Sequence, residues 1–177
     1  DHDAKAVEYL LGAGHKARSA CLNDEVIAYY ERCLDTLTEA GLDDDHPDWR
    51  VSALGGLTRI LVGVGRAGDA EKYGRDAVAL AKATGTSRAE TVRLLFWLAE
   101  ALQSQSRYDD VMGIAEEGLA LLADDTESVG AVLMNHQMAA AARNRGLLDL
   151  SLKHTTRNAQ FIRDLPYTEE RGAAYIQ

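Results

Sequence analysis

One amphipathic phrase that recurs along the chain limits the folds that the chain can adopt. The first copy lies at residues 23–37, where apolar side chains follow the i, i+3, i+4, i+7 spacing of a helix, at Val26, Ile27, Tyr30, Cys33, Leu34 and Leu37. Asn23 is placed to cap this helix, and the acidic residues Asp24 and Glu25 suit its first turn. The segment therefore predicts a helix with one buried stripe.

The phrase returns three more times when the chain is aligned on itself. The equivalent positions are 44, 41 and 40 residues apart, at Val26, Ala70, Val111 and Ser151. Two further columns hold mostly small residues, one at Cys33, Ala77, Gly118 and Asn158 and the other at Gly14, Thr58, Ala99 and Ala139. Small residues at fixed positions let paired helices approach closely, and repetition lets each copy bury a face that it cannot bury alone. The sequence therefore predicts an all-α helical solenoid.

The repeat spacing and the local turn residues together predict where the helix pairs begin and end. We expect four pairs and a partial ninth helix, at about 4–40, 48–83, 88–122, 126–163 and 168–177. Gly41 suits a left-handed cap, Pro47 the first turn of the next helix, and Ser87 an N-cap. We interpret residues 1–177 as one domain, and the unfinished last helix indicates an excised piece of a longer polypeptide.

The composition disfavours several classes of partner. A net charge of −9 with scattered Lys and Arg does not fit a surface that binds nucleic-acid phosphates or anionic lipid. No apolar run is long enough to cross a bilayer, and the N-terminus lacks the apolar segment of a signal peptide, so we expect a cytoplasmic protein. Cys21 and Cys33 are expected to be small buried residues, without a disulfide or a metal site.

Two turn phrases, at residues 65–70 and 106–111, together with small-aromatic-small spacing in the second helix of a pair, resemble the tetratricopeptide repeat (TPR). The resemblance covers essentially the whole chain and implies a right-handed superhelical solenoid of about four TPR-like helix pairs. The repeats are elongated, at about 40 residues instead of the usual ~34. The consensus proline that closes each repeat is absent, at Thr38, Lys82, Ala123 and Arg163.

A narrower resemblance covers residues 9–37, where a helix of Leu-Leu-x-Ala-Gly type precedes one of Ala-Tyr-Tyr-x-x-x-Leu type. This segment is similar to the part that follows the ATP-binding domain in multidomain bacterial AAA or STAND ATPases with class III nucleotide cyclase or LuxR-type regulator domains. The resemblance implies a non-catalytic protein–protein interaction and regulatory module of a larger signalling protein. The alternatives are a self-association scaffold, a free-standing adaptor and a small-molecule-sensing helical domain.

Three groups of residues resemble nucleotide-binding or metal-binding motifs, but structural or surface roles explain them better. Residues 63–68 match G-x-G-x-x-G, but the repeat places these glycines at a turn between helices, and a dinucleotide site needs a strand before them. The acidic residues within 43–48 fit a solvated loop that caps the next helix. His15, His136 and His154 lie on separate helices without metal-ligand spacing, which favours surface or groove side chains. We therefore predict no catalytic residues, metal or cofactor.

The TPR resemblance implies a partner-binding groove lined by inward-facing residues of the first helix in each pair. Carried over by repeat position, the groove residues are Glu8, His15, Arg18, Arg59, Arg93, Phe96, Glu100, Gln103, His136 and Arg143. Phe96 is expected to face this groove, whereas Trp97 follows the apolar face and is expected to pack in the core. The expected partners are a protein, a peptide or neighbouring domains of the same chain, and the solenoid ends offer a surface for homodimerisation.

Overall fold

The computed structural model describes residues 2–123, 125 and 128–164, which form eight α-helices and no strand. In chain order the helices are α1 (His2–Ser19), α2 (Asn23–Glu39), α3 (Pro47–Gly63), α4 (Ala67–Thr84), α5 (Arg88–Ser104), α6 (Tyr108–Leu121), α7 (Val129–Asn144) and α8 (Leu148–Asp164). The predicted all-α class is therefore confirmed. The helix predicted at 168–177 lies outside the described residues.

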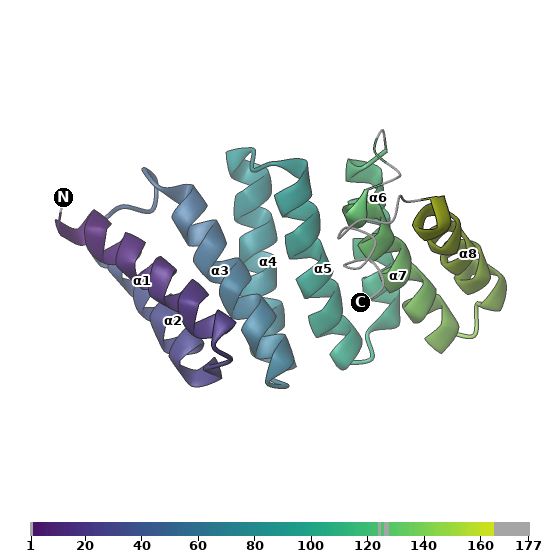
Figure 1. Cartoon of the computed structure of the whole chain (residues 1–177), viewed down its shortest axis with the longest axis horizontal. Helices are drawn as coiled ribbons and strands as arrows, with labels where there is room; N and C mark the ends of the chain where they lie inside the picture. The colour runs from purple at the N-terminus through teal and green to yellow at the C-terminus, as the bar shows by residue number, and fades with distance from the viewer. Residues whose placement is uncertain (1, 124, 126–127, 165–177) are drawn as a thin grey trace.

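The helices follow one another in a row along the long axis of the molecule (Figure 1). Each helix packs against its neighbours in sequence, and α1, α3, α5 and α7 also pack in turn against one another. The odd-numbered helices therefore form a continuous layer, and side chains carried on different odd helices lie on a shared surface.

Helix α2 shows both what the local pattern determines and where it is wrong. Of its predicted stripe, Val26, Tyr30, Cys33 and Leu37 are fully buried, while Ile27 and Leu34 are partly buried. Asn23 does not cap the helix: it is the first helical residue, Leu22 is the N-cap, and no side-chain bond is made there. By contrast, Ser87 caps α5 as predicted, because its hydroxyl accepts a hydrogen bond from the Glu90 amide.

Four residues with positive φ lie at the turns that join α1 to α2, α3 to α4, α5 to α6 and α7 to α8. They are Cys21, Gly65, Ser106 and Gly146, with φ of 57°, 80°, 58° and 76°. Cys21 is therefore exposed, and its predicted burial is wrong: the turn after α1 requires a left-handed residue at a solvent-facing position. Gly41 has φ of 65° after α2, as the sequence predicted, and Pro47 begins α3.

Close approach of α1, α2 and α3 depends on one aromatic ring between two glycines. Tyr30 projects from α2 and is 0% exposed. A Cβ atom at Gly14 of α1 would lie 2.7 Å from Tyr30 Cε1, and one at Gly56 of α3 would lie 2.4 Å from Tyr30 Cε2. The ring therefore fills the space that side chains at Gly14 and Gly56 would occupy.

Candidate functional site

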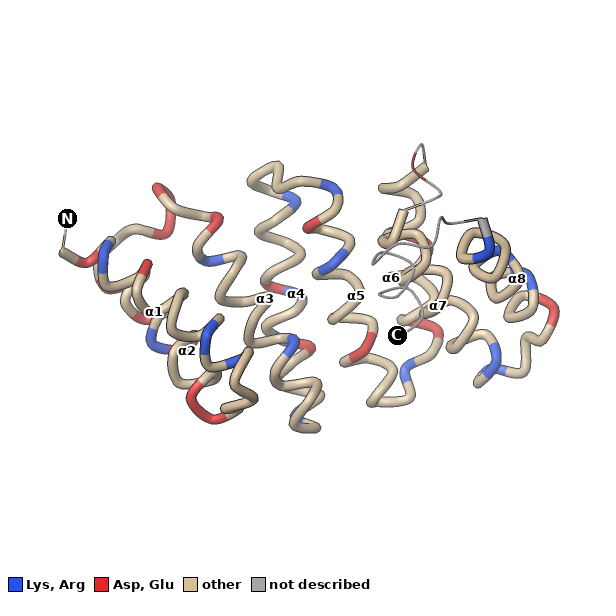
Figure 2. The backbone as a smooth tube through the Cα atoms, in the orientation of Figure 1, with Lys and Arg blue, Asp and Glu red and all other residues tan. Residues whose placement is uncertain are grey.

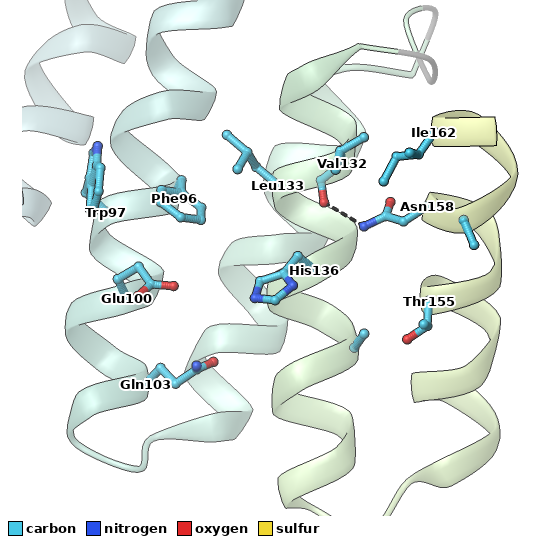
Figure 3. A pocket seen from close by; sticks show the side chains of 12 residues that line it. Phe96, Trp97, Glu100, Gln103, Val132, Leu133, His136, Thr155, Asn158 and Ile162 are labelled. Atoms are coloured by element: carbon cyan, nitrogen blue, oxygen red, sulfur yellow. Dashed lines mark hydrogen bonds between the residues drawn. The ribbon is translucent and has the colours of Figure 1, made fainter. Parts of the chain in front are cut away.

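A pocket of about 650 Å³ lies between α5, α7 and α8 (Figure 3). Its apolar wall consists of Phe96, Trp97, Val132, Leu133, Ala139, Ala159 and Ile162. Its polar residues are Glu100, Gln103, His136, Thr155 and Asn158. Ligand pockets in proteins are typically about 300–1,000 Å³, mostly apolar, with a few placed polar groups. We call this cavity the α5–α7–α8 pocket.

Helix α5 supplies one wall of the pocket because its lining residues recur at helical spacing. Phe96, Glu100 and Gln103 lie at i, i+4 and i+7 and so share one face. The rings of Phe96 and Trp97 meet edge to face, with centroids 4.9 Å apart. Figure 3 shows Phe96 and Leu133 on facing sides of the pocket, one from α5 and the other from α7. Trp97, which the sequence assigned to core packing, is partly buried and also lines the pocket.

Amide side chains hold the polar part of the pocket in place. Gln137 of α7 is fully buried, and its Nε2 donates a hydrogen bond to Glu100 Oε1, which fixes that carboxylate across the α5–α7 boundary. Asn158 Nδ2 donates to the Val132 carbonyl oxygen at 2.9 Å. In the described part of the chain, Gln103 Oε1 and Asn158 Oδ1 are buried without a hydrogen-bond donor. Both pocket residues therefore retain acceptor capacity.

A polar seam joins α7 to α8 and forms the support beneath the pocket. Ser151 Oγ donates to the Ala139 carbonyl oxygen at 2.9 Å, and His154 Nδ1 lies 2.7 Å from Asn135 Oδ1. With Asn158, these side chains lie at i, i+3 and i+7 on one face of α8. His154 is 8% exposed, so its predicted surface or groove position is wrong, because Asn135 gives its ring a buried partner.

Because the seam contains a buried histidine, we expect the free energy of unfolding to fall on mild acidification. Burial, followed by the charges of Lys153 and Arg157, lowers the pKa of His154 from 6.5. Below pH 6.5 the unfolded chain therefore binds more protons than the folded chain, and the free energy of unfolding falls as pH falls toward the folded pKa. Urea unfolding at about pH 7.5 and about pH 5.5 should show this decrease, and His154→Gln should make it smaller.

His15 serves as the comparison for this measurement. Burial, followed by Arg18 and Arg93, also lowers its pKa, so part of the wild-type pH dependence should remain when either histidine alone is replaced. An unchanged pH slope in His154→Gln would show that the seam does not contribute to it.

A second group of polar residues lies on the neighbouring odd-numbered helices. Arg18 of α1 is one turn after Gly14, and Arg59 of α3 is one turn after Gly56, so both follow the glycines that contact Tyr30. The Arg59 guanidinium lies 5.0 Å from the centroid of the Trp97 ring, and Arg93 precedes Trp97 by one turn of α5. We call Arg18, Arg59 and Arg93 the arginine cluster.

The charges of the cluster act on one another and on its surroundings. Burial, followed by Arg18 and Arg93, lowers the pKa of Arg59. Burial raises the pKa of Tyr30, and the same three arginines oppose that shift. The His15 ring meets the Tyr30 ring edge to face, with centroids 5.9 Å apart. His15 therefore borders the cluster from α1.

The structure divides the ten predicted groove residues into three sets. Phe96, Glu100, Gln103 and His136 line the α5–α7–α8 pocket. His15, Arg18, Arg59 and Arg93 lie around Tyr30 and Trp97. Glu8 and Arg143 are exposed on α1 and α7, and no described hydrogen bond or ion pair joins them to either group.

Several pocket residues were missed because they do not belong to the first helix of a pair. Thr155, Asn158, Ala159 and Ile162 come from α8, and their i, i+3, i+4, i+7 spacing is the signal that marks them as one face. Trp97 directly follows Phe96 in the sequence. Because adjacent residues of a helix point in different directions, the sequence pattern placed the two rings on different faces, whereas both line the same pocket.

The remaining motifs have structural roles in the part of the chain that is described. Gly63 ends α3, Gly65 forms the turn to α4, and Gly68 lies within α4, so the G-x-G-x-x-G phrase is a helix–turn–helix junction as expected. Asp43 pairs with Arg50 at 2.6 Å and does not cap α3, whose N-cap His46 makes no side-chain bond. The described residues contain no group of three or more His, Cys, Asp or Glu side chains that fits a metal ion.

None of the helices within the described ranges is both long enough and apolar enough to span a membrane. In comparisons with known proteins, no family model matches this chain and no curated protein matches it.

Proposed function

We propose that this chain is a non-catalytic protein–protein interaction module that binds a peptide, or a segment of a neighbouring domain, along its odd-numbered helices. Its architecture in this proposal is a right-handed superhelical solenoid of about four TPR-like helix pairs. The left-handed turns at Cys21, Gly65, Ser106 and Gly146 support the repeat, since they are spaced by the same 44, 41 and 40 residues as the sequence columns.

The α5–α7–α8 pocket is the observation that carries the binding function. Phe96 and Leu133 offer apolar surface to an anchoring side chain. Gln103 and Asn158 place polar amide groups beside that surface, and neither amide oxygen has a described hydrogen-bond donor. A cavity that combines an apolar anchor site with polar groups fits peptide recognition better than a uniformly polar surface does.

A library selection tests this function and needs no candidate partner. Peptides enriched on the wild-type protein from a random display library should lose about tenfold or more in affinity on Leu133→Gln, because the substitution places an amide in the apolar wall. Leu80→Gln is the matched control: both leucines are partly buried against the same core cluster, but Leu80 lies on α4 and does not line the pocket.

Each outcome of the selection decides the proposal. A loss confined to Leu133→Gln supports binding in the pocket. Equal losses in both variants, or no enriched peptide on the folded wild type, would contradict it. Fluorescence of Trp97 in a Trp49→Phe background provides the affinity readout, because Trp49 and Trp97 are the two tryptophans of the chain.

Self-association is the second candidate, and one surface favours it. On α8, Leu148 is 68% exposed and Leu152 is 66% exposed, one turn apart on the same face. Sedimentation of the same preparation separates the candidates: the interaction module is a monomer that binds peptide, whereas a scaffold forms a dimer that Leu148→Gln with Leu152→Gln dissociates.

The cellular setting rests on the sequence. Residues 9–37 resemble the segment after the ATPase domain of bacterial signalling proteins with cyclase or transcriptional-regulator domains, so the module is proposed to regulate such a neighbour. A partner that binds the pocket more tightly in one state of the protein than in the other would shift the neighbouring domain toward that state. The cytoplasmic location stays a prediction.

A further inference from the structure

The arginine cluster is a positive site on a chain with a net charge of −9. Acidic and basic residues are otherwise distributed along the whole row of helices (Figure 2). Arg93 is paired with Glu90, and its Nε donates to Glu90 Oε2 at 2.9 Å. Among the described residues, neither Arg18 nor Arg59 forms an ion pair. Glu90 therefore neutralises one of the three charges and two remain.

A buried hydroxyl lies beneath this uncompensated charge. The Tyr30 ring passes between Gly14 and Gly56 with its Cζ atom next to both glycines, and Arg18 and Arg59 follow these glycines by one helical turn. Tyr30 is 0% exposed, and its oxygen has no hydrogen-bond partner among the described residues. Native proteins rarely leave a buried hydroxyl unpaired, and here the described residues leave the hydrogen-bonding capacity of this group unused.

Arg59 connects the cluster to the α5–α7–α8 pocket. Its guanidinium stacks over Trp97, and Trp97 is itself part of the pocket wall. Stacking on an aromatic face occupies the plane of a guanidinium but leaves its edge N–H donors free for a carboxylate or phosphate. A ligand group in the pocket and an anion on Arg59 would therefore both lie next to the Trp97 side chain.

We infer that the arginine cluster is an anion subsite, and that it binds the acidic side chain of a peptide whose adjacent apolar side chain enters the pocket. The inference rests on the proposed function and adds the chemical class of the peptide. Charge complementarity selects an acidic peptide, because two uncompensated guanidinium groups favour a carboxylate and disfavour a basic ligand.

The test combines changes in the peptide with changes in the protein. Among peptides selected on the wild type, replacing the acidic residue by its amide should weaken binding about tenfold. On the double variant Arg18→Gln with Arg59→Gln, the same acid-to-amide replacement should weaken peptide binding less than about threefold. The guanidinium charges that attract the carboxylate in the wild type are absent from this variant.

A matched variant controls for the loss of net charge. Arg32→Gln with Arg75→Gln removes the same charge from α2 and α4 and should leave the acid-to-amide difference at its wild-type size. Selected peptides without acidic residues, or an equal acid-to-amide difference on all three proteins, would overturn the subsite while leaving the pocket function intact.

Inorganic phosphate separates the subsite from the proposed function. In nuclear magnetic resonance spectra at constant ionic strength, phosphate should shift the side-chain Nε–Hε signals of Arg18 and Arg59 saturably and leave that of Arg32 unchanged. This result would support the subsite even if no peptide were selected. Uniform, non-saturating shifts would count against it, since they report screening alone.

Discussion

Replacing Tyr30 by alanine is expected to lower the free energy of unfolding by about 3–5 kcal/mol, the largest effect of any single change considered for this chain. The ring is fully buried and lies where α1, α2 and α3 meet. Gly14 and Gly56 have no side chains to fill the cavity, so the surrounding helices cannot close it without moving their backbones. Urea unfolding at neutral pH measures the change.

Tyr30→Phe is the control for this prediction. It keeps the ring and removes a hydroxyl that has no described partner, so we expect a change within about 1 kcal/mol. A loss in Tyr30→Phe as large as that in Tyr30→Ala would assign the stabilisation to the hydroxyl and contradict the packing account.

The second large effect is expected from adding a single methyl group at Gly56. A Cβ there would lie 2.4 Å from Tyr30 Cε2 and 2.6 Å from Cζ, inside the contact distance of the ring. Because an aromatic ring on a buried helix face cannot move aside as a flexible chain end does, Gly56→Ala should lower the free energy of unfolding by about 1–3 kcal/mol. The measurement is the urea midpoint at constant slope.

Gly12→Ala on α1 gives the matched comparison. A Cβ at Gly12 meets no atom within 4 Å, and glycine inside a helix costs about 1 kcal/mol relative to alanine, so this variant should be neutral or more stable. In a Tyr30→Ala background, Gly56→Ala should lose most of its cost. If Gly12→Ala and Gly56→Ala behaved alike, helix propensity would outweigh the close packing on Tyr30.

The candidate site was predictable only in part. Phe96, Glu100 and Gln103 could be grouped from sequence because helical spacing places them on one face of α5. Arg59 and Arg93 were assigned to the first helices of their pairs by repeat position, as the TPR resemblance implies. The stacking of Arg59 on Trp97 could not be predicted, because it depends on the rotation of α3 against α5.

The sequence by itself determined the all-α class, the outer bounds of the segments 4–40, 48–83, 88–122 and 126–163 to within a few residues, and the left-handed turn at Gly41. These features depend on local causes: apolar periodicity, small residues at fixed spacing, and glycine or proline beside a helix end. A residue and its neighbours within one or two turns contain all the information that such predictions need.

Only the tertiary structure decided which polar side chains are buried and which cavity they line. His154 is buried because Asn135 of α7 meets it, Cys21 is exposed because its turn faces solvent, and α8 completes the pocket through Asn158. Each outcome depends on the distance and rotation between two helices. The volumes of the side chains at the contact set the distance and the rotation between two helices, and the periodicity of apolar residues along one helix contains no information about either.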